Sequence, residues 1–88
     1  MADRFRLCVY TPEREVIDGE VRDVTAPGAY GEIGVLPDHA ALVTTLEAGV
    51  LTYRQDAGVA RLAIGGGFAE VRDNVMTVLA DSAEPAGG

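Results

Sequence analysis

The residues whose side chains could perform catalysis are few and isolated in this sequence. His39 is the one imidazole and lies beside Asp38, a pair that suggests a proton relay. A general base needs an acid or a nucleophile within reach, and the sequence supplies none nearby. Cys8 alternates away from its apolar neighbours, with only Arg6 close enough to activate it. We therefore favour a histidine bonded to backbone and a packed, unreactive thiol, and we assign no catalytic residue.

Carboxylates occur in pairs that are two residues apart: Glu13 with Glu15, and Asp18 with Glu20. The acids of a glycosidase face each other across a cleft, and the pKa of one of them is raised. Residues two apart lie instead on one side of an extended segment. The pattern favours an exposed acidic edge over an acid–base pair.

Two groups of glycines invite comparison with nucleotide-binding loops. Phosphate-binding loops lead into a helix N-terminus, whereas the residues that follow Gly65-Gly66-Gly67 have the pattern of a strand. The triplet therefore predicts a kink or a close backbone crossing. Gly28, Gly31 and Gly34 are spaced three apart, which is not the dinucleotide fingerprint. No cofactor is expected.

Composition excludes several further classes. The chain has 88 residues, a formal net charge of −7, seven arginines and no lysine. Nucleic acid and anionic lipid are poor partners for such a chain, and lysine-dependent chemistry is impossible. One cysteine and one histidine complete neither an internal disulfide nor a zinc site, so we expect no metal and a reducing compartment. No apolar run approaches the ~20 residues of a membrane span.

Apolar residues alternate in short runs that are typical of strands. From Arg4 to Tyr10 they occupy every second position, and Val75–Ala80 is apolar on both faces, as in a central strand. Turns are expected at Ala48-Gly49 and Asp73-Asn74. Short strands with frequent turn signals predict an all-β sandwich. We expect one domain over residues 1–82 and a flexible tail over 83–88.

The loop from Pro27 to Pro37 combines glycines with Tyr30 and Glu32. An exposed aromatic ring and a carboxylate at a β-turn are typical of a contact loop. A simple decorated hairpin explains the composition equally well, so the residues alone leave both interpretations open.

The run from Val24 to Thr44, VTAPGAYGEIGVLPDHAALVT, resembles the most recognisable stretch of the epsilon subunit of F-type ATP synthases. Two later segments match the same family in order and spacing: IGGGFAEV at 64–71 and NVMTVLAD at 74–81. The resemblance covers almost the whole chain, from Phe5 to Ala83.

The resemblance implies a sandwich of two packed antiparallel sheets in a non-catalytic subunit of the central stalk. Such a subunit couples ion flow through the membrane rotor ring to ATP synthesis or hydrolysis by binding the gamma subunit and the ring. Carried over by position, the ring contacts are Tyr30, Gly31 and Glu32, and the gamma contacts are Thr11, His39 and Thr44. The glycine triplet matches the kink at which a strand changes sheet.

Family members usually continue into a pair of C-terminal helices, which this sequence lacks. Neither nucleotide binding nor helical inhibition is therefore expected of these residues. The implied location is peripheral, on the cytoplasmic face of the energy-coupling membrane and without insertion into the bilayer. The alternative hypothesis is a free-standing β-sandwich module that binds another protein through a concave apolar pocket.

Overall fold

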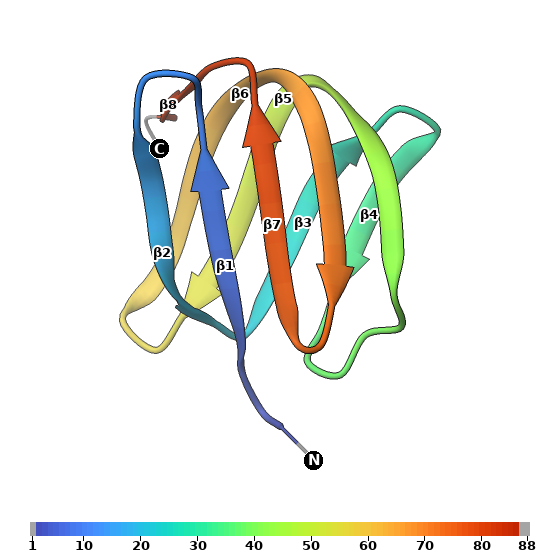
Figure 1. Ribbon diagram of the computed structural model, residues 1–88. Helices are drawn as coiled ribbons and strands as arrows, with labels where there is room; N and C mark the ends of the chain where they lie inside the picture. Colours follow the sequence, from blue (N-terminus) through green and yellow to red (C-terminus); the bar gives the residue numbers. More distant parts are fainter. Residues whose placement is uncertain (1, 87–88) are drawn as a thin grey trace.

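The computed structural model describes residues 2–86, and its regular elements are all strands (Figure 1). None of the described elements is a helix long and apolar enough to cross a membrane. The all-β prediction is confirmed. The strands, in chain order, are β1 Phe5–Tyr10, β2 Glu15–Val21, β3 Asp23–Gly28, β4 Gly31–Val35, β5 Leu42–Gln55, β6 Gly58–Arg72, β7 Val75–Ala80 and β8 Ala83–Pro85.

The strands form a two-layer sandwich in which β5 and β6 belong to both layers. The hydrogen-bonded order is β2-β1-β7-β6-β5-β3-β4, with β8 added at β6. The front sheet in Figure 1 contains β2, β1, β7 and the adjoining halves of β6 and β5, and the back sheet contains their other halves with β3, β4 and β8. All pairs are antiparallel except β1 with β7. Those two strands are far apart in sequence, so no hairpin fixes their relative direction.

One uninterrupted register joins β5 and β6 across both layers. It runs from Leu42 opposite Val71 to Gln55 opposite Gly58, and no residue is inserted at the bend. The turn expected at Ala48-Gly49 is wrong, because both residues continue the ladder within β5. The bend is made on the β6 side, where Gly66 and Gly67 have φ of 104° and 140°. The predicted kink at the glycine triplet is confirmed.

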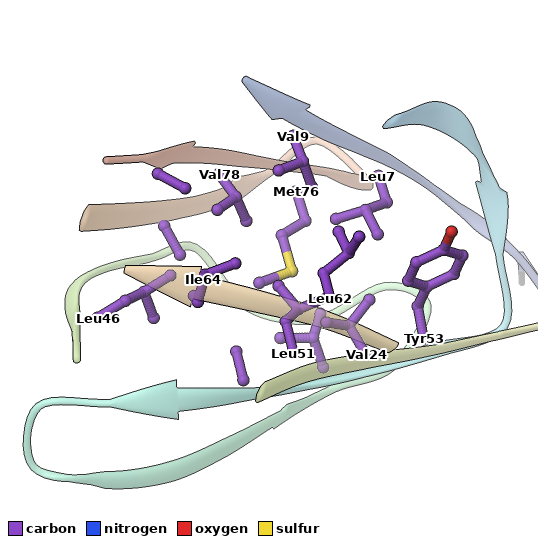
Figure 2. Packing of buried hydrophobic residues seen from close by; sticks show 14 of the residues in the cluster. Leu7, Val9, Val24, Leu46, Leu51, Tyr53, Leu62, Ile64, Met76 and Val78 are labelled. Carbon is purple, nitrogen blue, oxygen red and sulfur yellow. The ribbon is translucent and has the colours of Figure 1, made fainter. Parts of the chain in front are cut away.

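The core fills the space between the two layers with aliphatic side chains (Figure 2). Every second residue of β1 and β7 points inward, and Leu7, Val9, Met76 and Val78 are completely buried. The back sheet supplies the opposing surface, chiefly Leu51, Leu62, Ile64 and Val24. Burial of this kind contributes about 1.5–3 kcal/mol per large side chain and holds the layers at a fixed spacing.

Two chain segments test the finer boundaries of the sequence prediction. Asp73 and Asn74 both have positive φ, 52° and 62°, and connect β6 to β7 as a two-residue hairpin turn, as predicted. The predicted tail from residue 83 begins instead with β8, which pairs with β6 and buries Ala83. The folded domain therefore extends beyond Ser82, while residues 87–88 of the predicted tail lie outside the described residues.

A cluster of ion pairs fixes the β5–β6 turn against the start of the chain. The Asp56 carboxylate accepts a hydrogen bond of 2.8 Å from Arg4 and one of 2.6 Å from Arg22. The two arginines lie on either side of the β1–β2 hairpin, so Asp56 joins three segments that are distant in sequence. Their hydrogen bonds to the carboxylate, Arg22 first, lower the pKa of Asp56 below its ordinary value.

We predict that Gly67→Ala destabilises the protein more than Gly58→Ala. Both glycines have φ of 140°, so alanine at either costs about 1–3 kcal/mol in backbone strain. A Cβ at Gly67 would also overlap the Leu79 carbonyl oxygen and lie 2.9 Å from the Ala80 Cα, whereas none of the atoms around Gly58 lies within 4 Å. The overlap adds about 1–3 kcal/mol. Urea denaturation measures both variants, and equal losses would contradict the steric argument.

We predict that Asp56→Asn flattens the acid side of the stability profile. A carboxyl group whose pKa is lowered by folding stabilises the protein above its unfolded pKa of about 3.9, and that contribution is lost as the pH falls through the lower folded pKa. The unchanged protein should therefore lose more of its thermal midpoint below about pH 4 than Asp56→Asn does. Glu84→Gln, at an exposed position of β8, is the control; parallel curves for all three proteins would refute the assignment.

Candidate functional site

An uncharged row of side chains crosses the outer face of the front sheet. The pairing places Tyr10 of β1 beside Leu79 of β7, Leu79 beside Phe68 of β6, and Phe68 beside Thr45 of β5. We call these four residues the docking row. Phe68 is 57% exposed and Leu79 is 54% exposed, so the row presents large apolar side chains to solvent. Apolar side chains gathered on one exposed face indicate a surface that another protein covers.

The docking row follows from residues that alternate between the two faces of a strand. In β7, Val78 and Ala80 point into the core, so Leu79 between them must point outward. The sequence prediction of a central strand is confirmed, because β7 lies between β1 and β6. The strand is apolar on both faces, and its outer face is open to solvent at Leu79. Apolar residues on both faces of Val75–Ala80 were the available signal for this surface.

Charge on this outer face increases with distance from the docking row. The next row holds Cys8, Thr77 and Val43 with two charged residues, Glu70 of β6 and Asp18 of β2. The row beyond it holds Arg6 and Arg72. The four residues of the docking row carry no formal charge, and Glu15 of β2, which pairs with Tyr10, is the one charged residue at its margin. Burial of this end of the face therefore desolvates the least charge.

A bidentate ion pair closes the β2 side of the face. The Nε and Nη2 of Arg6 each donate to an Asp18 carboxylate oxygen at 2.7 Å. This hydrogen bonding lowers the pKa of Asp18 and raises that of Arg6. The Cys8 Sγ lies 3.7 Å from Asp18 Oδ1 and is buried, which agrees with the packed thiol that the sequence suggests.

The second exposed surface is the turn between β3 and β4, where Tyr30, Gly31 and Glu32 lie together. Gly28 pairs with Gly31, and Pro27 pairs with Glu32, so the turn consists of Ala29 and Tyr30. Tyr30 is 99% exposed, and Gly31 and Glu32 are also exposed. We call Tyr30, Gly31 and Glu32 the tip. An aromatic ring held fully in solvent has no role in packing within residues 2–86.

The tip and the docking row are joined through the backbone of β5. The Ala29 N–H donates to the Thr45 carbonyl at 2.9 Å, and Gly28 pairs with Leu46. Thr45 ends the docking row, while Ala29 begins the turn that carries the tip. The two surfaces therefore stand at a fixed distance and angle on a common hydrogen-bonded frame.

The structure does not gather Thr11, His39 and Thr44 into one cluster. Thr11 begins the β1–β2 turn, where its hydroxyl accepts from the backbone N–H groups of Glu13 and Arg14 at 3.3 Å. His39 lies in the β4–β5 loop at the opposite end of the front sheet (Figure 1). Thr44 pairs with the buried Ala69 and points to the inner face at the sheet margin. Thr11 and His39 thus lie in loops at opposite ends of the front sheet, and Thr44 lies on its inner face.

The side chains of His39 and Asp38 form structural contacts. The His39 Nδ1 lies 2.6 Å from the Ala40 carbonyl, so the ring is bonded to backbone as the sequence suggests. Asp38 accepts instead from the Ala2 N–H at 2.9 Å. The paired acids are exposed on β2 and the turn before it, which is a sheet edge, and charge there discourages pairing with another chain. Residues 2–86 contain no group of three metal-ligating side chains.

Comparison with known proteins agrees with this geometry. Residues 4–86 match the family model described as the ATP synthase, Delta/Epsilon chain, beta-sandwich domain. The ATP synthase epsilon chain of Desulfitobacterium hafniense is 48% identical over 85 residues, which are 97% of this chain and 64% of that protein. The ATP synthase epsilon chain of Carboxydothermus hydrogenoformans is 49% identical over 84 residues, 96% of this chain and 63% of the other. The chain thus spans a little under two thirds of these relatives.

Solved structures show the same fold. A chain in the cryo-EM structure of the Euglena gracilis mitochondrial ATP synthase, comprising OSCP, F1 and c-ring, matches with a TM-score of 0.90 and 27% identity. The match covers 97% of this chain and 55% of that one. A chain from the central stalk and c-ring of the Tetrahymena thermophila mitochondrial ATP synthase has a TM-score of 0.78 at 17% identity, with 90% and 64% coverage. At that identity the second match supports the fold alone.

Proposed function

Because the chain belongs to the family of the ATP synthase delta/epsilon chain β-sandwich domain, we propose that it is a non-catalytic subunit of the central stalk. In this role it binds the gamma subunit through the front sheet and the membrane rotor ring through the tip. It thereby couples ion flow through the ring to ATP synthesis or hydrolysis. Its place is peripheral, on the cytoplasmic face of the energy-coupling membrane.

The observation that carries the proposal is the hydrogen-bonded link between two separate exposed surfaces. A coupling subunit must pass torque from one partner to another, which requires a rigid body that is bound at two separate surfaces. The Ala29–Thr45 hydrogen bond joins the tip to the docking row without an intervening flexible loop. The continuous β5–β6 ladder and the aliphatic core prevent the layers from sliding.

The docking row is better suited to contact with the gamma subunit than to contact with the membrane rotor ring. It is broad, apolar and lies on a sheet face, as protein interfaces with a buried centre require. Thr11 and His39, the positions that the family resemblance assigns to gamma, lie in loops at opposite ends of the front sheet (Figure 1). Thr44 would act indirectly, by supporting β5 beneath Thr45.

The tip fits a narrow, polar target. Glu32 projects from the outer side of the β3–β4 hairpin next to the exposed Tyr30, so a basic or amide-rich loop of the ring would complement it. An exposed charge pair is worth only ~0–1 kcal/mol, which suits a contact that positions the subunit while the front sheet supplies the affinity.

The alternative of a free-standing binding module makes a different prediction about partners. Such a module would not bind the cognate gamma subunit, and its ligand would occupy a concave site. Micromolar binding of purified gamma to the isolated chain therefore separates the two hypotheses, and failure to bind would favour the module.

We predict that Phe68→Glu weakens gamma binding while Val59→Glu does not. Both residues are exposed on strand β6, 57% and 61%, but Phe68 lies on the front sheet and Val59 on the back sheet. A carboxylate in the docking row must be desolvated on binding, which should raise the Kd at least tenfold, or about 1.4 kcal/mol. Isothermal titration of gamma into each variant measures the effect. Equal Kd values for the two variants would place the interface elsewhere.

We predict that Glu32→Lys lowers proton pumping driven by ATP hydrolysis in the reconstituted complex and leaves the fold intact. Glu32 is exposed and makes no side-chain hydrogen bond or ion pair within residues 2–86, so its replacement removes only a surface charge. Glu84→Lys, on β8 and away from the tip, is the matched control. Unchanged pumping by Glu32→Lys, with thermal midpoints equal for all proteins, would argue against a ring-facing tip.

A further inference from the structure

A groove of about 660 Å³ runs alongside the docking row, because all four residues of the row line it. Tyr10, Phe68 and Leu79 of the row form one side of the groove. Pro12 of the β1–β2 turn and Leu46 of β5 contribute further apolar surface. The glycine triplet lines the remainder, so the kink that carries β6 from one layer to the other also hollows the surface beside it.

Asp81 is the one formally charged group among the described residues that line this groove. It follows β7, and its backbone N–H donates to the Gly66 carbonyl at 2.9 Å. A Cβ at Gly66 would lie 3.7 Å from Asp81 Oδ2, so the carboxylate stands directly over the glycine. Within residues 2–86 this carboxylate takes part in none of the side-chain hydrogen bonds or ion pairs, and it is exposed.

The apolar lining and the Asp81 carboxylate together favour a positively charged group in the groove. An anion such as phosphate would meet a carboxylate with no arginine in the lining, and the triplet leads into a strand, so no helix N-terminus faces the groove. A purely apolar segment would bury the Asp81 carboxylate without a partner, which is costly. A cation carried on an apolar stem satisfies both the carboxylate and the apolar wall.

We propose that the groove receives an arginine or lysine side chain of the gamma subunit, with its methylene stem against Phe68 and Leu79 and its charged head at Asp81. The inference rests on the proposed docking of gamma at the front sheet and adds the specificity of that contact. The docking row supplies apolar contact area. The groove fixes the position of gamma along the front sheet, because the cationic side chain can pair with only one carboxylate there, that of Asp81. Long-range attraction between unlike charges also speeds encounter, and this effect weakens with salt.

The test uses the full chain and purified cognate gamma. Asp81→Asn should weaken gamma binding roughly tenfold at low salt and reduce the dependence of Kd on salt concentration. Asp81→Glu, which keeps the charge, should retain most of the affinity. Glu84→Gln, an exposed acid on β8, should bind like the unchanged chain. All variants should keep the same thermal midpoint, because the Asp81 side chain is not used in the fold.

The outcomes separate this inference from the function on which it rests. If gamma binds the unchanged chain, and among the variants only Asp81→Asn shows weaker gamma binding with less salt dependence, the groove binds a cationic side chain of gamma. If gamma binds every variant equally, docking at the front sheet stands, and the proposed binding of a cationic side chain in the groove is refuted. If gamma does not bind the unchanged chain, the proposed function fails, and the proposed binding of a cationic side chain in the groove fails with it.

Discussion

The rest of the structure depends on the requirement that β5 and β6 change layers without losing their shared register. The pairs from Leu42 with Val71 to Gln55 with Gly58 keep one register through the bend. A one-residue slip on either strand would turn every inward side chain outward. The bend is possible because Gly67 takes a φ of 140° where the Leu79 carbonyl leaves no room for a Cβ. The positive φ at Gly67 thus allows one pair of strands to belong to both sheets.

That constraint also creates the surfaces on which the proposed function relies. Since β6 must arrive in the front sheet in one register, Phe68 falls between Leu79 and Thr45, and the docking row is straight. Since β5 bends with it, Thr45 reaches the Ala29 N–H and carries the tip. The fold of this chain and its candidate contacts are therefore consequences of the same pairing.

Local sequence patterns predict several of the strands and the β6–β7 turn. Alternation predicts β1, apolar residues on both faces predict β7, and the tolerance of Asn74 for positive φ predicts the β6–β7 hairpin. The turn predicted at Ala48-Gly49 is wrong, because the sequence does not distinguish a glycine in a long bent strand from a glycine in a turn until the partner strand is known. β8 was missed for a similar reason, since three residues have no period and gain their order from pairing with β6. Tertiary context decided both.

The distribution of charge explains how an acidic chain avoids unwanted partners while keeping a specific one. A net charge of −7 repels other copies and anionic surfaces, and the acids of β2 protect a sheet edge. The docking row is uncharged, so close approach there is not opposed locally. In the proposed complex, the partner brings apolar area to the row and positive charge to Asp81 in the adjoining groove. Area alone would permit sliding along the sheet, and charge alone would bind weakly in water. Their combination at neighbouring positions is what allows a body of this size to be held in a single orientation.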